Sequence, residues 1–287
     1  MRATHFVAIA VAIALVIVLY MSGNTIPPPK ATVSEMQRPG SGGAVSGGPA
    51  KVAAASFDSI LVGASRSVSK NIKDSVLAIE HKLDAAQDPV IKSGLYIQLS
   101  RIWEHAGRLP VAAYYSSKSA RLENSEKKLN FAGQFFLQLM ENESSSPVQA
   151  WEAAEAVSCL EQSLKLNPDN EDTKLALATG YIEGTEEPMR GVQILLAIVR
   201  EKPDDIPANM LLGRMAIQSG QYDKAIGRYE TVLKLEPENK EALYFLAQAS
   251  EGKGDKKRAI ELLEKCKKLV SDPAFSKEID DRINSLK

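Results

Sequence analysis

The side chains best suited to catalysis or metal binding are few in this sequence, and their spacing forms no site. Cys159 and Cys266 lie 107 residues apart, and neither belongs to a CxxC or CxxCH motif. His5, His81 and His105 are scattered, so the closely spaced ligands that zinc or covalent haem requires are missing. We therefore expect no metal and no cofactor. Both cysteines are interpreted as small apolar residues on buried helix faces.

Glycine loops and acidic pairs add no catalytic motif. The sequence contains no nucleophile elbow and no phosphate-binding glycine loop, and no two carboxylates stand out from the solvated acidic residues of helix faces. The glycines of the 252–254 segment stand between two apolar helical stripes, where they predict a turn. These observations favour a protein that is not an enzyme.

Composition favours an all-α fold and gives no sign of a nucleic-acid partner. Of the 287 residues, 44% are hydrophobic and 25% are charged, which suffices for a sizeable core. Only 6% are aromatic, and Ala, Leu, Lys and Glu dominate the second half, so helices are favoured over strands. The formal net charge is -1 and no basic block occurs, so the electrostatic pattern of a nucleic-acid-binding protein is missing.

The amino terminus predicts a transmembrane signal anchor over residues 1–23. Residues 6–21 carry no charge, and with their small neighbours they reach the ~30 Å thickness of a bilayer core. The segment ends in LYMSG, without the small residues that a signal peptidase requires, so an uncleaved anchor is favoured. Arg2 precedes it and the next charge is Lys30, which predicts that the N-terminus is inside. The expected location is the inner (cytoplasmic) membrane, single-pass, with the repeats on the periplasmic side.

Two further segments precede the repeats. Residues 24–55 are rich in Pro, Gly and Ser, so they predict a disordered linker that spans on the order of 30 Å. Residues 56–88 carry apolar residues at steps of three and four, which predicts one long amphipathic helix capped by Ser56. This helix either covers the first hairpin of the domain or pairs with a second copy. The lack of a sustained heptad favours the cover, and a dimer through residues 57–86 stays open.

A period in the thirties organises the later part of the 89–287 domain. Pro168, Pro203 and Pro237 recur at spacings of 35 and 34, each after an apolar helix. Such a period is typical of stacked helical hairpins, because one hairpin cannot bury its apolar face alone. Two helices approach closely only where small side chains meet. The predicted close contacts pair Gly213 with Ala225 and Ala247 with Ala259.

The pattern resembles the tetratricopeptide repeat family, whose repeat of about 34 residues has small residues at positions 8 and 20, a large one at 24 and Pro at 32. With Ile206 as position 1, these positions hold Gly213, Ala225, Tyr229 and Pro237. The likeness is clear over residues 171–270 and weak upstream, where one unit is about ten residues too long. It implies a right-handed α-α superhelix (solenoid) of about four to five hairpins, followed by a C-terminal capping helix.

The family likeness also implies a partner-binding groove along the first helix of each hairpin. Family members that bind chaperone tails clamp a terminal carboxylate with Lys and Asn. Repeat position 5 holds Leu175, Met210 and Tyr244 in this chain, which is evidence against such a clamp. The predicted groove residues are Leu175, Thr179, Ile182, Met210, Arg214, Ile217, Tyr244, Gln248 and Glu251.

The anchor, linker and repeats together imply a membrane-anchored adaptor or scaffold. It would bind a protein or peptide partner in the groove and assist the assembly, folding or secretion of envelope proteins. Two alternatives stay open. The layout is similar to that of tethered tetratricopeptide modules that hold apocytochrome during cytochrome c maturation. The other alternative is a structural spacer that dimerises through residues 57–86.

Overall fold

The computed structural model describes residues 53–287, and all regular structure in that range is helical. The predicted anchor and nearly all of the predicted linker lie outside the described residues. Among the helices that are described, none is long and apolar enough to span a membrane. The helices in chain order are α2 (Phe57–Arg66), α3 (Lys70–Ala85), α4 (Pro89–His105), α5 (Leu109–Leu122), α6 (Glu126–Asn142), α7 (Ser146–Leu166), α8 (Glu171–Gly184), α9 (Pro188–Glu201), α10 (Ile206–Gln218), α11 (Tyr222–Leu235), α12 (Lys240–Gly252), α13 (Lys256–Leu269) and α14 (Pro273–Leu286).

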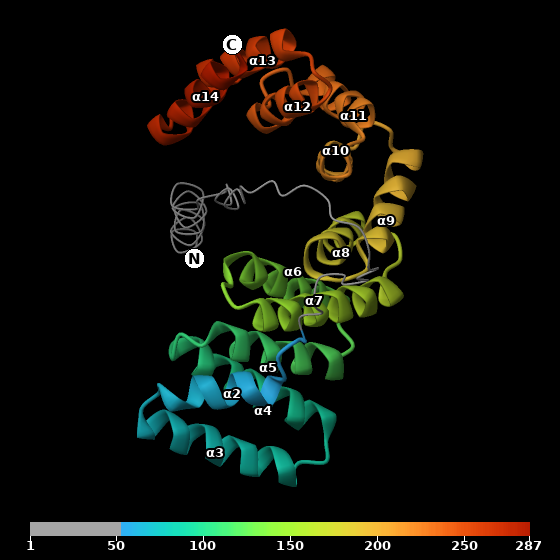
Figure 1. Ribbon diagram of the computed structural model, residues 1–287. Helices are drawn as coiled ribbons and strands as arrows, with labels where there is room; N and C mark the ends of the chain where they lie inside the picture. Colours follow the sequence, from blue (N-terminus) through green and yellow to red (C-terminus); the bar gives the residue numbers. More distant parts are fainter. Residues whose placement is uncertain (1–52) are drawn as a thin grey trace, which may run out of the picture. The chain divides into compact units, whose positions relative to one another are not determined.

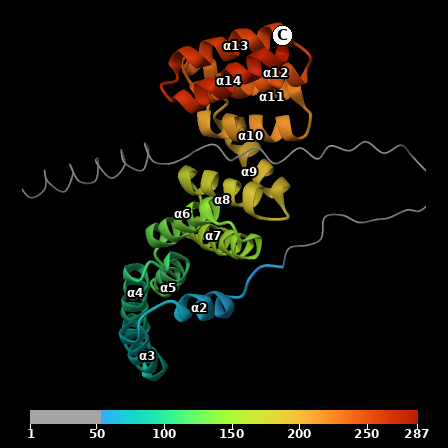
Figure 2. The same ribbon diagram turned by 60° about the vertical axis from the view of Figure 1, so that its left-hand side comes forward.

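Ten of these helices form hairpins that stack in chain order (Figures 1 and 2). The pairs are α4–α5, α6–α7, α8–α9, α10–α11 and α12–α13, and α14 follows as a single helix packed against α13. Residues 53–287 therefore contain five hairpins and a terminal helix, in agreement with the predicted solenoid. Pro237 lies in the exposed turn between α11 and α12, as its repeat position predicts.

Glycines in the left-handed conformation close three of the hairpins. Gly107, Gly220 and Gly254 have φ angles of 68°, 71° and 92°, a region that side chains with a Cβ rarely adopt. Each follows a first helix and lets the chain reverse while the last helical carbonyls stay bonded. After α10, for example, the Gln221 N–H donates to the Ala216 carbonyl at 2.8 Å. The turns predicted at residue 220 and at residues 252–254 are confirmed.

Residues 56–88 form two helices rather than the single long helix that the sequence predicts. α2 stops short of α3, and Ser69 begins α3 by accepting a hydrogen bond from the Ile72 backbone at 3.4 Å. Because the apolar stripe continues across this break, periodicity alone does not reveal it. The prediction that the segment covers the first hairpin is confirmed, since Val76 and Ile79 are buried in the core of α4 and α5.

Phe57 joins α2 to two hairpins. Its ring stacks on Tyr114 of α5 with the centroids 3.6 Å apart, and it lies 6.2 Å from the Trp151 ring of α7. Next to it, the Ala55 N–H donates to the Pro147 carbonyl at 2.8 Å. The start of α2 therefore fixes the first hairpin to the second.

The residues predicted to pack the repeats are buried, except Pro237, which lies in an exposed turn. Ala225, Ala247 and Ala259 are buried between helices. The three atoms nearest to a Cβ placed on Gly213 all belong to the Tyr229 ring, the closest at 2.5 Å. Gly213 therefore makes room for the Tyr229 ring, the aromatic side chain at position 24, while its contact with Ala225 stays a prediction.

Both cysteines are buried and free, as the sequence predicts. Burial raises the pKa of Cys159 to about 11, so its thiol stays protonated at neutral pH. Within residues 53–287, no three His, Cys, Asp or Glu side chains come together as a metal site.

Candidate partner-binding groove

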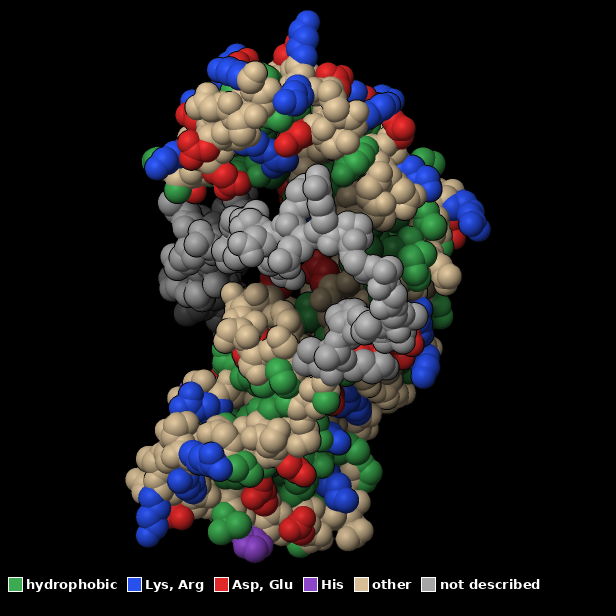
Figure 3. All heavy atoms as spheres, viewed as in Figure 1, with side chains coloured by type: hydrophobic (Ala, Val, Ile, Leu, Met, Phe, Trp, Pro, Cys, Tyr) green, Lys and Arg blue, Asp and Glu red, His purple; other side chains and the backbone are tan. Residues whose placement is uncertain are grey.

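The nine predicted groove residues lie on α8, α10 and α12, the first helices of three consecutive hairpins. All nine are half-buried, so each presents part of its side chain to solvent. We call the surface formed by the first helices α6, α8, α10 and α12 together with α14 the groove face. Figure 3 shows that the molecular surface is hollowed between the α6–α8 part and the α12–α14 part.

Four predicted residues give the groove face an apolar lining. Leu175 and Ile182 pack at the edge of the core around α8 and α9. Met210 and Ile217 do the same for the core of α10 to α12. Because these side chains are only partly covered, they can bury further apolar area when a partner binds. On the next first helix, α12, the Gln248 amide makes no hydrogen bond within the described chain and is free to bind a peptide backbone.

Arg214 bridges two neighbouring first helices. Its Nη2 donates to Glu183 Oε1 at 2.6 Å, which joins α10 to α8. Both side chains are about one-third exposed (37% and 29%), so the pair is partly shielded from solvent. A partner that enters here meets an existing ion pair rather than a free guanidinium.

Glu141 of α6 is a groove residue that sequence reasoning missed. Burial and the nearby Glu183 charge raise the pKa of Glu141, and Arg214 opposes this shift. Glu141 forms no ion pair and no hydrogen bond within the described chain. The residue has no counterpart in the repeat pattern, because α6 has 17 residues whereas α10 has 13. The only sequence feature that pointed to Glu141 was the extra length of the repeat unit that contains α6.

The capping helix α14 engages two of the predicted groove residues. The Tyr244 hydroxyl donates to Glu278 at 2.8 Å and accepts from Arg282 Nη1 at 3.0 Å. Arg282 also donates through Nε and Nη2 to Glu251, at 2.9 and 2.7 Å. The polar groups of Tyr244 and Glu251 are therefore bonded within the chain, which leaves Gln248 as the unbonded groove residue of α12.

The arginine bridges follow the repeat. Arg214 and Arg282 both stand at repeat position 9, and each binds a Glu near the end of the preceding first helix. An outer pair repeats in the same way on the second helices. Arg190 binds Glu161 at 2.9 Å, and Arg258 binds Glu230 at 2.6 Å. Such exposed pairs add little stability individually, and each joins a helix to its counterpart in a neighbouring repeat unit.

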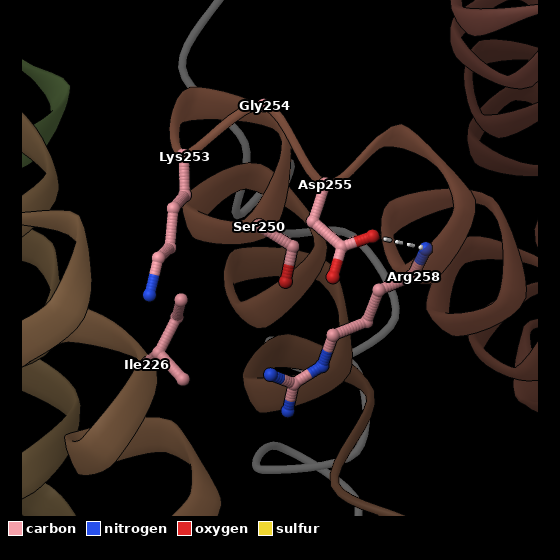
Figure 4. A pocket seen from close by; sticks show the side chains of 6 residues that line it. All are labelled: Ile226, Ser250, Lys253, Gly254, Asp255 and Arg258. Carbon is pink, nitrogen blue, oxygen red and sulfur yellow. Dashed lines mark hydrogen bonds between the residues drawn. The ribbon is translucent and has the colours of Figure 1, made fainter.

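A small cavity lies outside the groove face, beside the turn between α12 and α13 (Figure 4). Its volume is about 470 Å³, and its lining includes Lys253 and Arg258. Lys253 binds Asp223, and Arg258 binds Glu230 at 2.6 Å, so neither cation is free for an anion. The cavity therefore follows from the turn that residues 252–254 form, and we assign it no ligand.

The comparisons with known proteins agree with this architecture. The sequence model of the tetratricopeptide repeat family matches residues 210–271, and no curated protein sequence matches the chain. A tetratricopeptide repeat protein from Parabacteroides merdae is similar in structure, with a TM-score of 0.52 and 14% identity over 80% of this chain and 86% of that chain.

Two other solved structures are less similar. MamA from Desulfovibrio magneticus has a TM-score of 0.49 and 24% identity, over 64% of this chain and 96% of that chain. YrrB, described as a tetratricopeptide repeat protein with an unusual peptide-binding site, has a TM-score of 0.47 and 18% identity, over 75% of this chain and 100% of that chain.

The stacked hairpins and the family match define the class of the protein. Residues 210–271, which run from α10 to just past α13, match the tetratricopeptide repeat family, and the stacked hairpins of the described chain have the fold of tetratricopeptide repeat proteins. Proteins of this family typically act as non-enzymatic scaffolds that bind peptides or other proteins.

Proposed function

We propose that this protein is a membrane-anchored adaptor that binds a protein partner on its groove face and assists the assembly, folding or secretion of envelope proteins. The observation that carries the binding role is the row of half-buried side chains along α8, α10 and α12. In that row, Met210 and Ile217 of α10 are apolar, and Gln248 of the next first helix, α12, has an amide that is unbonded within the described chain. A peptide laid across the row would bury apolar area and gain backbone hydrogen bonds.

The anchor in this proposal rests on the uncharged stretch of residues 6–21. It predicts that the full chain stays in the membrane fraction after a high-salt wash and keeps its first residues. A mature protein that begins after Ser22 would contradict the anchor. That result would leave the groove assignment untouched, since the two parts of the proposal depend on different residues.

Affinity capture of the full chain from its own cells tests the groove assignment. The double variant Met210→Ala/Gln248→Ala removes one apolar and one polar side chain of the groove face without changing its charge, and we expect it to retain at least fivefold less partner than the wild type. The matched control is Lys234→Ala/Gln193→Ala, which changes exposed residues on second helices. Equal partner yield from wild type and groove variant, with both variants folded by circular dichroism, would contradict the proposal.

A further inference from the structure

The charge of the groove face differs from that of the whole chain. The five helices that form this face contain ten acidic and seven basic residues. These helices therefore carry a formal excess of three negative charges, while the whole 287-residue chain carries -1. Acidic side chains are also visible inside the hollow in Figure 3. The carboxylates that contacts or the repeat register place toward the groove are Asp172, Glu183, Glu241, Glu251, Glu278 and Glu141, and the cations are Arg214 and Arg282.

The two arginines do not present free positive charge to a partner. Arg214 is held by Glu183 at 2.6 Å, and Arg282 is held by Glu251 at 2.7 Å. Three other carboxylates of the groove face have no ion-pair partner within the described chain. These unpaired groups are Glu141, Asp172 and Glu241.

The excess is concentrated where α6, α8 and α10 meet. The negative charges of Glu141 and Glu183 repel each other. The Arg214 guanidinium forms an ion pair with Glu183 and also attracts Glu141. Such an arrangement leaves about one uncompensated negative charge beside the partly shielded Arg214–Glu183 pair, where an added cation gains more than it would in open solvent. Apolar surface adjoins it, because Met210 lies one turn before Arg214 on α10.

We propose that the groove face takes a cationic peptide segment of a protein partner, with aliphatic residues on the apolar lining and one Lys or Arg between Glu141 and Glu183. This inference rests on the proposed function and adds the chemistry of the partner to it. Acidic segments and free C-terminal carboxylates are repelled by the same charges. The absence of a Lys and Asn clamp at repeat position 5 agrees with that exclusion.

Peptide binding to the purified full chain tests the charge preference. Three acetylated and amidated decapeptides share five aliphatic positions and carry Lys, Gln or Glu at the other five. Fluorescence anisotropy at low salt is expected to show at least tenfold tighter binding of the Lys peptide than of the Glu peptide. The advantage should shrink when NaCl is raised from about 50 to about 300 mM, since salt screens charges that reach solvent.

A charge-matched pair of variants locates the site. Glu141→Gln/Glu183→Gln removes two carboxylates of the groove face, and Glu261→Gln/Glu264→Gln removes two from the exposed side of α13. We expect at least fivefold weaker binding of the Lys peptide by the first variant and less than a twofold change in the second. Equal losses in both variants, equal affinity for the Lys and Glu peptides, or no binding of any peptide would overturn the inference. The capture experiment decides the proposed function separately, since it makes no assumption about peptide charge.

Discussion

Glu152 is the least expected residue of the core. It lies on α7 with 1% of its surface exposed, and neither carboxyl oxygen has a hydrogen-bond partner among residues 53–287. Burial, aided by the Glu143 charge, raises its pKa from the usual 4.5 to about 7. An ionised carboxylate in such a place is costly, so the folded protein keeps this group neutral where the unfolded chain would ionise it.

The pH dependence of stability should report this residue. Between about pH 4.5 and 7 the folded state holds a proton that the unfolded state releases, so the carboxyl group destabilises the fold as pH rises through this window. Glu152→Gln should therefore be more stable than wild type at pH 8, by up to about 3 kcal/mol, and nearly equal to it at pH 4.5. Thermal melts at several pH values measure this difference. A constant offset between the two proteins across the range would contradict it.

Gly213 offers a second test at the residue scale, because α11 supplies its control. A Cβ on Gly213 would lie 2.5 Å from the Tyr229 ring, whereas a Cβ on Gly227 meets nothing within 4 Å. Alanine gains about 0.5–1 kcal/mol over glycine within a helix, and overpacking costs about 1–3 kcal/mol. Gly213→Ala should therefore destabilise the protein while Gly227→Ala stabilises it slightly. Chemical denaturation compares the two, and the same sign of change in both would contradict the packing account.

At the scale of elements, the Phe57 ring is the main contact between α2 and the first two hairpins. Phe57 stacks on Tyr114 and approaches Trp151, so it links the cores of the first and second hairpins. Sequence periodicity predicted that this segment covers the first hairpin, but it could not predict the break before Ser69. Ser69 begins the new helix through one side-chain hydrogen bond, and such a bond does not change the spacing of the apolar residues from which the helix was predicted.

Removing that ring should loosen the N-terminal end selectively. Phe57→Ala is expected to cost about 1–3 kcal/mol, less than a fully buried phenylalanine, because the ring is half-buried. The effect should appear as faster amide hydrogen exchange in α2 to α5, with α10 to α14 unchanged, because repeat stacks are stabilised by nearest neighbours. Phe131→Ala is the control, since that ring is 66% exposed. Equal exchange in both variants would contradict the role of Phe57.

At the scale of the molecule, much of the stack follows from the sequence and the groove chemistry follows only in part. The spacing of Pro168, Pro203 and Pro237 predicts the regular hairpins, because each must bury an apolar stripe against its neighbours. Which side chains form hydrogen bonds or ion pairs depends on how the helices are arranged in the fold. The spacing therefore could not show that Arg282 donates hydrogen bonds to Tyr244 and Glu251. It also could not show that Glu141, in the extra turn of α6, lies close enough to Glu183 for their charges to interact.

The central claim is that partners bind along the first helices, and in-cell photocrosslinking tests it most directly. A photoreactive amino acid replaces Met210 or Gln248 on the groove face, or Gln193 or Glu264 on second helices, in the full chain. We expect the same partner protein to be crosslinked from both groove positions, at least tenfold more than from either outer position. Equal crosslinking from the groove and outer positions, or a partner captured only from α9 and α13, would contradict the account.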